Sequence, residues 1–330
     1  MGMATGRDLH VDQHLTEIAL AYRPKALIAD MIAPIVIVGK ESNTYATYSQ
    51  AEALAHHDTL RARGTEAKKI TASVSSDRYT VKNYALAYGM PIEDRANMDA
   101  AYTQQLDIGA TFRVLDGLGI DWERRVCAKI SSASNVASAF VPNSAWNAGN
   151  TSNTNAGDPI GAIYAAREQQ NTLTAGYEPN SILFGWKAWN WFRRNYHARN
   201  FINGVNNGGS HITREQARSA LEMERLLVAG SFRSTNNEAQ AAAYANNFPA
   251  DAVLLYYAPL RASTEEPSFM YSFRWQNPLL PTPLSVERHA YDTKRKEDLI
   301  EAGYYQDEKI TASTLGHLIL GVGSAQSNGI

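Results

Sequence analysis

The sequence contains a single cysteine, Cys127, in 330 residues. One thiol excludes an internal disulfide, and it leaves no set of thiolate ligands for zinc or an iron–sulfur cluster. We therefore expect the chain to fold in a reducing compartment, without disulfide bonds.

A long hydrophobic run is also missing. The longest apolar stretch, residues 26–38, is interrupted by Asp30 and Pro34. It is shorter than the roughly 20 residues that a helix needs to cross a bilayer. The first residues, MGMATGRDLHVDQ, contain no apolar signal core. The sequence therefore predicts a soluble protein that does not bind a membrane.

Acidic and basic side chains are nearly balanced in number. The 31 basic and 33 acidic side chains give a formal net charge of -2. Tight binding of nucleic acid through charge needs a strongly basic face, so the composition argues against it. The hydrophobic fraction of 44% is typical of a globular protein and too high for a disordered one. The length suits one large domain or two closely joined ones.

Catalytic signatures are scarce. The sequence has no G-x-S-x-G motif, no H-E-x-x-H motif and no complete phosphate-binding loop. His56 and His57 are adjacent, but neighbouring loop histidines are poor metal ligands without further partners. Glu265 and Glu266 lie in a polar turn that is more typical of a solvated loop than of a catalytic pair. We predict a protein that is not an enzyme, with no catalytic residue, metal site or cofactor.

The strongest candidate for nucleic-acid binding is the segment of residues 186–199. Its basic side chains alternate with aromatic rings: Arg193, Arg194, His197 and Arg199 with Trp186, Trp189, Trp191 and Phe192. Such rings could stack on single-stranded bases. The same spacing fits an amphipathic helix with buried rings and arginines at its wet edge, and we favour this interpretation.

What the chain does contain is one very long helix, predicted over residues 99–132 with Asp99 as its N-cap. Its apolar face consists of residues three and four positions apart: Leu115, Leu118, Trp122, Val126 and Ile130. Charged positions, Glu123 among them, fall elsewhere on the helix. At about 1.5 Å per residue the helix is roughly 50 Å long, which is typical of the backbone of an elongated body.

Two segments before this helix need a partner to be stable. Residues 10–21 predict a short helix, and residues 26–38 predict an extended apolar arm that its own fold or a neighbour must cover. Residues 43–50 and 69–76 predict the strands of a long polar hairpin. Such a hairpin is marginal in water unless it rests on something, although a solvated surface hairpin is the plain alternative.

The remaining segments predict a mixture of helices and strands. Helices are expected at residues 91–99, 159–173, 187–202 and 213–223, and strands at residues 79–90, 181–184, 225–231, 252–258, 270–275, 284–292, 299–309 and 310–322. Thr213 and Gln216 form a capping box at the start of the last helix. Residues 134–158 and 203–211, rich in Asn and Gly, are expected to be loops.

Several phrases, in colinear order, resemble the major capsid proteins of tailed bacteriophages, which have the Hong Kong 97-type fold. These phrases are LTEIALAYRPKALIADMIAPIVIV (15–38), GTEAKKITASVSSDRYTVKNYALAYGMPIEDRANMD (64–99), NSILFGWKAWNWFRRNYHARNFING (180–204), ERLLVAGSFRSTNN (224–237) and FPADAVLLYYAP (248–259). The resemblance covers nearly the whole chain, and the order of the phrases is more specific than any one of them.

The resemblance implies an α+β fold with the parts of a Hong Kong 97-type capsid subunit. These parts are an N-arm (1–39), an extended E-loop hairpin (40–82), a P-domain (83–176) with a spine helix (99–132), an A-domain (177–275), and strands that return to the P-domain (276–330).

The same resemblance implies a function. The expected protein is a major capsid protein that forms hexamers and pentamers of an icosahedral shell around double-stranded DNA, in the virion of a tailed phage or prophage. Assembly is expected in the cytoplasm of the bacterial host, with a separate scaffolding protein, a portal, a decoration protein, and weak non-specific contact with the DNA. An encapsulin-like nanocompartment shell is an alternative with the same fold, and a hydrolase or nucleic-acid-binding enzyme is a second alternative.

The resemblance also places the contacts between subunits. E-loop contacts with acidic side chains of a neighbour are expected from Arg61, Arg63, Lys68 and Lys69; N-arm contacts from Leu15, Ile18, Ile28 and Ile32; and an axial loop from Asn203, Gly204, Asn207 and Gly208.

Overall fold

The computed structural model describes residues 27–48, 60, 74–97, 100–148, 157–174, 176–204, 211–236, 243–262, 266–280, 282–292 and 296–323. The helix expected at residues 10–21 and the cap expected at Asp99 lie outside this part of the chain. Among the described helices, none combines the length and the apolar character needed to span a membrane.

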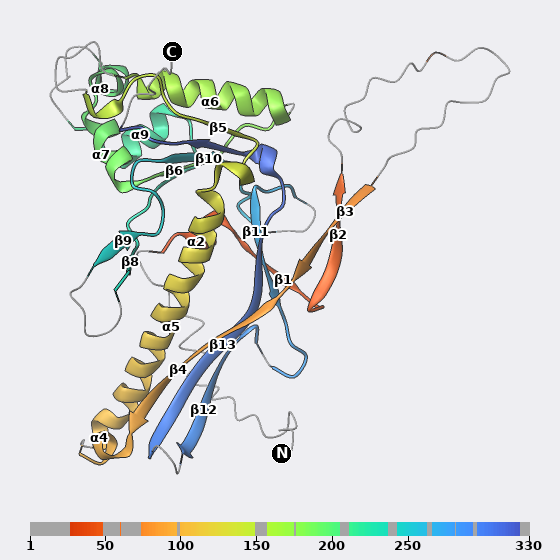
Figure 1. Cartoon of the computed structure of the whole chain (residues 1–330), viewed down its shortest axis with the longest axis vertical. Helices are drawn as coiled ribbons and strands as arrows, with labels where there is room; N and C mark the ends of the chain where they lie inside the picture. The colour runs from red at the N-terminus through yellow and green to blue at the C-terminus, as the bar shows by residue number, and fades with distance from the viewer. Residues whose placement is uncertain are drawn as a thin grey trace.

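Helix α5, Ala100–Ile130, runs along the molecule and joins an upper part to a lower part (Figure 1). The predicted apolar face is confirmed, because four of its residues are buried and the fifth packs against them: Leu115, Leu118, Val126 and Ile130, with Trp122. Gly117 lets strand β4 approach closely, since a Cβ there would lie 2.6 Å from Leu86 Cδ2. The helix therefore serves as the common support of both parts.

The lower part is a five-stranded sheet packed on α5. Its strands are β1 (Ile35–Val38), β4 (Lys82–Pro91), β11 (Met270–Trp275), β12 (Leu284–Asp292) and β13 (Glu297–Ile310). Strand β13 lies in the middle and is antiparallel to all its neighbours. Strand β4 pairs with one of its edges, and β12 and β11 pair one after the other along the opposite edge. Its buried side chains Ile300, Ala302 and Tyr304 form a core with α5. Strand β1 extends this sheet in parallel with β11.

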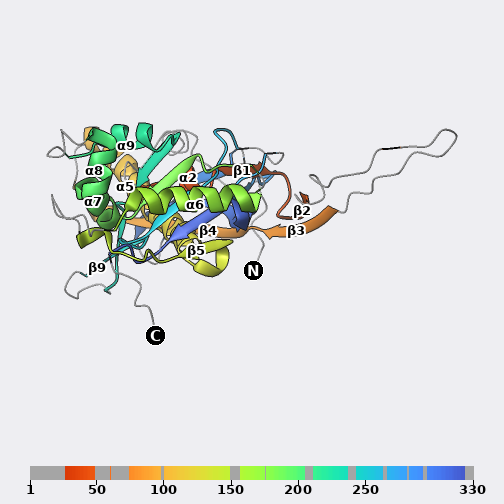
Figure 2. The ribbon, with the colours of Figure 1, turned by 90° about the horizontal axis from the view of Figure 1, so that it is seen from above.

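A separate hairpin projects from the lower sheet. Strands β2 (Ser42–Tyr48) and β3 (Val74–Thr80) pair with each other and point away from the body (Figures 1 and 2). Residue Val81 separates β3 from β4, and its N–H donates to the Glu41 carbonyl at 3.0 Å. The strand expected at residues 79–90 is thus divided between hairpin and sheet.

The upper part is a second five-stranded sheet covered by helices. Its strand order is β5 (Ser138–Phe140), β14 (Gly316–Ile319), β10 (Val253–Tyr256), β6 (Ser181–Phe184) and β7 (Arg225–Val228). Every residue of β6, β10 and β14 is buried. The covering helices are α6 (Pro159–Thr174), α7 (Trp186–Arg194), α8 (Tyr196–Asn203) and α9 (Arg214–Ala220), seen from above in Figure 2. The predicted capping box of α9 is present.

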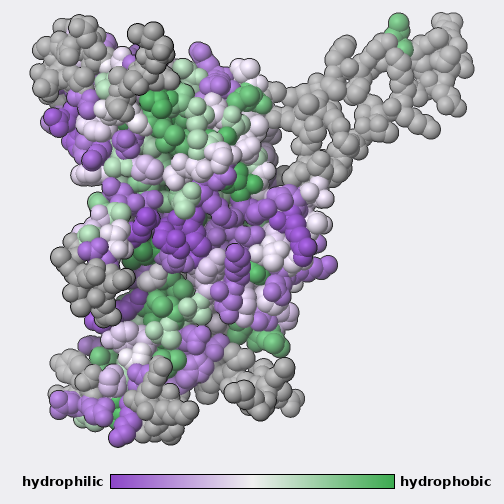
Figure 3. Space-filling view, in the orientation of Figure 1, coloured by the Kyte–Doolittle hydropathy of each residue, from purple (hydrophilic) through white to green (hydrophobic). Residues whose placement is uncertain are grey.

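The surface of the molecule is not uniform. The face seen in Figure 3 carries a hydrophilic band across its middle, with hydrophobic patches above and below it. A small hairpin, β8 (Phe232–Ser234) with β9 (Tyr244–Asn246), was not predicted, because three-residue strands leave too short a pattern to detect.

Further expected elements differ from the structure. The strand expected at residues 310–322 is divided among the end of β13, a 3₁₀ helix (Ser313–Leu315) and β14. The helix expected at residues 187–202 is two helices, because Asn195 accepts N–H bonds from His197 and Ala198 and so caps α8. The extended arm at residues 26–38 contains a single helical turn, α2 (Ala29–Ile32). The loop expected at residues 134–158 contains β5 and two short 3₁₀ helices, Ala133–Asn135 and Trp146–Ala148.

The two parts also divide the chain differently from the implied domain limits. Helix α6 packs in the core of the upper part, whereas β11 belongs to the lower sheet and β14 to the upper one. The chain crosses between the two parts several times, and neither composition nor periodicity predicts such crossings.

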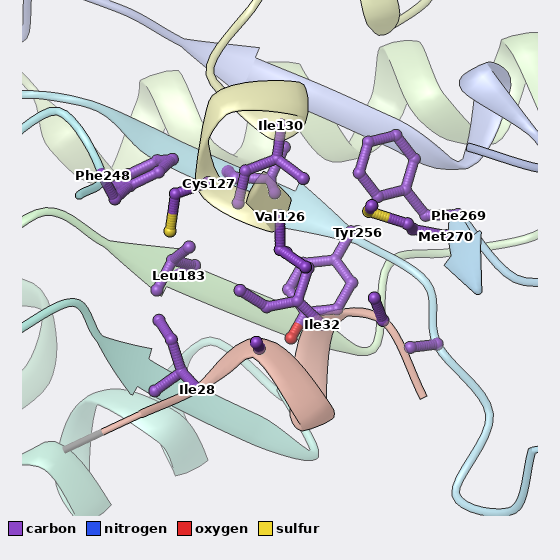
Figure 4. Close-up of a cluster of buried hydrophobic side chains, with 14 of the residues drawn as sticks. Ile28, Ile32, Val126, Cys127, Ile130, Leu183, Phe248, Tyr256, Phe269 and Met270 are labelled. Carbon is purple, nitrogen blue, oxygen red and sulfur yellow. The ribbon is translucent and has the colours of Figure 1, made fainter. Parts of the chain in front are cut away.

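A hydrophobic cluster joins the two parts where α2, the end of α5 and the upper sheet meet. Its buried side chains include Ile32, Val126, Ile130, Leu183 and Tyr256 (Figure 4). Because these residues come from distant segments of the sequence, the cluster fixes the upper part on the end of the long helix.

The upper sheet contains a buried histidine that has no hydrogen-bond partner among the described residues. His317 on β14 is 1% exposed, stands edge-on to Phe140, and has two unpaired ring nitrogens. Burial lowers the pKa of His317 to about 4. The imidazole is therefore neutral in the folded chain at moderately acid pH.

We expect His317 to make the fold sensitive to acid. The unfolded chain binds this proton first, since its histidine titrates near about 6.5, so stability present above that pH is lost as the pH falls toward 4. Between pH 7 and pH 5 this one residue should cost about 2 kcal/mol of unfolding free energy. Urea unfolding of unassembled subunits at both pH values, for the wild type and His317→Gln, measures it. Equal pH dependence in both proteins would contradict the expectation.

Candidate subunit-contact surfaces

The base of the projecting hairpin is anchored by aromatic rings. Tyr79 of β3 stacks on Phe273 of β11 with ring centroids 4.8 Å apart, and Tyr45 of β2 lies 5.4 Å from the same ring. Val36, Val81 and Tyr271 are the other buried members of this cluster. Aromatic burial of this kind holds the two strands against the lower sheet although they pair only with each other.

A hydrogen bond and an ion pair beside these rings also hold the base of the hairpin on the lower sheet. The Tyr45 hydroxyl donates to Asp77 at 2.7 Å, and the Lys309 ammonium of β13 lies 3.0 Å from the same carboxylate. Burial raises the pKa of Tyr45, and the hydrogen bond to Asp77 acts in the same direction. The hairpin therefore leaves the body at a set angle. The E-loop residues Arg61, Arg63, Lys68 and Lys69 lie outside the described residues.

The N-arm prediction is wrong for two residues. Ile32 is fully buried and Ile28 is 8% exposed, both within the cluster that joins α2 to α5 and the upper sheet. Their own chain covers Ile32 fully and Ile28 almost fully, so little of either side chain is open to a neighbour. Met31 and Ile37 are instead 41% and 62% exposed, so they provide the open apolar surface of this segment. Leu15 and Ile18 lie outside the described residues.

A buried carboxylate joins the N-arm to the long helix. Glu123 of α5 is fully buried, and its Oε2 accepts the N–H groups of Ile28 and Ala29 at 2.9 and 2.8 Å. Its Oε1 accepts the Ser231 hydroxyl at 3.0 Å, and Ser231 in turn accepts from Asn247 at 3.2 Å. The carboxylate thus satisfies the otherwise unpaired N–H groups at the start of α2 and fixes the base of the β8–β9 hairpin.

Glu123 was not recognised from the sequence, where it counted among the polar positions of the helix. Burial raises the pKa of its carboxyl, while the N–H groups of Ile28 and Ala29 and the Ser231 hydroxyl oppose that rise. The missed signal was its position: Glu123 lies one residue from Trp122 and three from Val126, at the margin of the apolar face.

Charged side chains also lie between α5 and the lower sheet. Arg125 donates to Glu308 Oε1 at 3.1 and 3.0 Å and to the Tyr304 hydroxyl at 3.1 Å. Its guanidinium lies 3.6 Å from the centre of the Tyr84 ring. Gln306 bridges Glu308 and Arg274 with bonds of 2.9 Å on each side. Arg125 and Glu308 form an ion pair, and Arg274 is hydrogen-bonded to Gln306, so each charged group here has a hydrogen-bond partner, which is the condition for keeping it in a core.

The Trp and Arg segment is mainly core, as favoured from the sequence. Trp189 and Phe192 are buried and stacked on each other, with ring centroids 5.8 Å apart. Trp186 is 49% exposed. The expectation that the arginines lie at a wet edge is wrong for Arg199, which is 2% exposed. A stacking platform of successive exposed rings, as single-stranded nucleic acid requires, is therefore not formed by Trp189 and Phe192.

The expected axial loop is described only at its start. Asn203 ends α8, and Gly204 follows it with a positive φ of 76°, a conformation that favours glycine at a helix end. Asn207 and Gly208 lie outside the described residues, so their place in an axial loop stays a prediction.

No candidate metal centre is formed by the described residues, since no three of their His, Cys, Asp and Glu side chains come together to hold an ion. His56, His57 and Glu265 lie outside this part of the chain. The lone Cys127 is buried, and burial raises the pKa of its thiol. A buried thiol of this kind is inert.

We expect the Glu123 carboxylate to be needed for the fold. Glu123→Leu removes the acceptor and leaves two buried N–H groups unpaired, which should cost about 2–4 kcal/mol of unfolding free energy. The matched Glu123→Gln keeps a carbonyl that can accept from Ile28 and Ala29, so it should cost less than half as much. Chemical denaturation of unassembled subunits compares them. Equal losses in both variants would show that the hydrogen bonds to α2 contribute little.

Comparison with known proteins supports the resemblance read from the sequence. No family model matches the chain. A major capsid protein of Pseudomonas phage JBD67 is 30% identical over 116 residues, which are 35% of this chain and 37% of that protein. The chain therefore spans little more than a third of the length of this curated relative.

The similarity to solved structures extends over almost the whole chain. A phage-related protein from Bordetella bronchiseptica RB50 superposes with a TM-score of 0.73 at 20% identity, over 96% of this chain and 98% of that one. The capsid of Cyanophage P-SCSP1u gives a TM-score of 0.57 at 10% identity, over 92% and 90% of the two chains. At such identities the likeness establishes the fold. The chain therefore has the Hong Kong 97-type fold of the phage capsid proteins.

Proposed function

We propose that the chain is the major capsid protein of a tailed phage or prophage, which assembles as hexamers and pentamers into an icosahedral shell around double-stranded DNA. The observation that carries the proposal is the fold, shared over nearly the full length with phage-related proteins. The partial sequence match to a phage major capsid protein supports the same role.

The physical character of the single chain agrees with this role. A two-stranded hairpin is marginal alone, yet β2 and β3 extend from the body and form a two-stranded sheet of their own within the described residues (Figure 2). Large apolar side chains are exposed on β1, where Ile37 is 62% exposed, and on the β8–β9 hairpin, where Phe232 is 51% and Tyr244 72% exposed. Apolar surface of this kind is typical of contacts between subunits.

The alternatives have less support. The relatives named above are phage or phage-related proteins, which favours a phage shell over an encapsulin-like nanocompartment. A hydrolase or nucleic-acid-binding enzyme loses its best candidate, because the rings of Trp189 and Phe192 are buried. We therefore propose a structural role in the virion, with the other copies of the chain as the main partners.

The finer contacts belong to the same proposal. The E-loop residues Arg61, Arg63, Lys68 and Lys69 contact a neighbour, and residues 203–211 lie at the axis of a hexamer or pentamer. A separate scaffolding protein and a portal complete assembly in the host cytoplasm, with a decoration protein on the finished shell. The wall, with a formal charge of -2 per chain, touches the DNA only weakly.

The test is the mass and shape of the purified chain, alone and co-expressed with the products of its neighbouring genes. Multi-angle light scattering and negative-stain imaging should show hexamers, pentamers or closed shells. A monodisperse monomer or dimer under both conditions would count against the proposal. DNA protected from nuclease inside the particles would separate a phage shell from a nanocompartment, which encloses protein instead.

A further inference from the structure

The upper sheet has two ends, and the segments at each end differ in charge. Strands β6, β7 and β10 are in register, so Ser181, Arg225 and Tyr256 lie together at one end. Phe184 pairs with Val228 at the opposite end, and α7 begins two residues after Phe184. Figures 1 and 2 both show α7 and α8 on the side of this opposite end, while α6 reaches toward the first. The segments that precede β6 and β7 therefore lie apart from α7.

Carboxylates gather at the Ser181 end. Two grooves of about 540 and 360 Å³ lie there, formed by α6 and by the segments that precede β6 and β7 or follow β10. Five exposed carboxylates line these grooves, and we call them the acidic end: Glu168, Glu178, Glu222, Glu224 and Glu266. The cations in the lining are Arg167 and Arg261, so negative charge is in excess.

The acidic end is only partly neutralised within its own chain. Arg167 lies 2.8 Å from Glu178 and 3.8 Å from Glu222, so one guanidinium serves two carboxylates. Among the described residues, neither Glu168 nor Glu266 forms an ion pair. Leu260, which is 78% exposed, adds apolar surface beside Glu266 in the second groove. Apolar surface rimmed by charged side chains is typical of a contact with another protein.

The opposite end carries the other sign of charge. The sequence has no Asp or Glu between Glu178 and Glu215, a stretch that includes all of α7 and α8. Lys187 and Arg194 of α7 are exposed and Arg193 is half-buried; we call these three cations the basic end. Within the part of the chain that the structure describes, none of the three forms an ion pair, and Arg193 Nε has no hydrogen-bond partner. The basic end is thus short of carboxylates, as the acidic end is short of cations.

We propose that the basic end of one copy binds the acidic end of the next copy, so that the upper parts join head to tail in a ring. This inference rests on the proposed function and names a contact between neighbours within a hexamer or pentamer. A contact between two different surfaces of identical chains closes into a ring when the rotation between copies allows it. Arginine can hold a carboxylate through two parallel hydrogen bonds, which suits the lining of the two grooves.

The partner is a second copy because one chain carries both charges and cannot pair them internally. The four residues of β6 alone hold the two ends roughly 10 Å apart, whereas an ion pair needs about 4 Å. In a ring, every copy offers its basic end to one neighbour and its acidic end to the other. The charges that are unpaired in the single chain are then matched at each contact.

The first test reverses the charge of one end at a time. Glu168→Lys with Glu266→Lys changes the acidic end, and Lys187→Glu with Arg194→Glu changes the basic end. Either pair sets like charges against each other, so assembly should need a subunit concentration about tenfold higher. Because all four side chains are exposed, the thermal midpoint of unassembled subunits should stay within about 3 °C of the wild type. Assembly at the wild-type concentration, or weaker assembly with a larger loss of subunit stability, would overturn the inference.

The second test combines all four changes in one chain. The two ends then have exchanged charges and attract again, so assembly should return to within about threefold of the wild-type concentration. The matched control joins the reversed basic end to Glu41→Lys and Glu93→Lys, exposed positions of the lower part. It has the same formal net charge as the four-change variant without the restored contact, so its assembly should stay weak. A four-change variant that assembles no better than this control would show that each end binds some other molecule, and would overturn the inference.

The outcomes distinguish this inference from the proposed function. Wild-type rings or shells that are indifferent to both reversals would overturn the contact and leave the capsid role intact. A wild-type chain that forms no higher assembly, alone or with the products of its neighbouring genes, would overturn the capsid role and, with it, this inference.

Discussion

The buried carboxylate of Glu123 is the contact on which the arrangement of the N-terminal part depends. It sits on the long helix and binds the first N–H groups of α2, a single turn that has no side-chain cap of its own. Because α2 is held there, the chain enters β1 in register with β11, where Val36 pairs with Phe273. The same Phe273 ring then receives Tyr79 and Tyr45 at the hairpin base. The Glu123 carboxylate on α5 thus helps, through α2, β1 and Phe273, to set the direction in which the hairpin projects.

Charged side chains are arranged differently on the two faces of the lower sheet. Between the sheet and α5, Arg125, Arg274, Gln306 and Glu308 form a closed network whose members hydrogen-bond to one another. On the other face, Glu287 lies directly opposite Glu301, and among the described residues His289 lies 3.3 Å from Glu301 and 3.8 Å from Glu287. A closed network of hydrogen-bonded charges stabilises the subunit itself.

The sequence predicted the elements whose signal is local. Strands Ser181–Phe184, Met270–Trp275 and Leu284–Asp292 lie where their apolar or alternating patterns placed them, and α5 differs from its predicted limits by one or two residues. The capsid-type fold was predicted from the resemblance of the colinear phrases to phage capsid proteins. The failures concern single side chains whose role depends on distant partners. Glu123 was placed among the charged positions outside the apolar face, and its burial was missed because Ile28 and Ser231, which satisfy it, lie far away in the sequence. Asn195 interrupted an apparently continuous helix because its amide also binds the carbonyls of Trp146 and Gly157.

The measurement that tests this account most directly is a cryo-EM reconstruction of particles purified after co-expression with the neighbouring genes. The account predicts a closed icosahedral shell in which each subunit keeps Glu123 bonded to the start of α2, while neighbouring copies cover the exposed apolar side chains of the single chain, Ile37 among them. Particles whose subunits leave these surfaces facing solvent, or the absence of any closed particle, would contradict it.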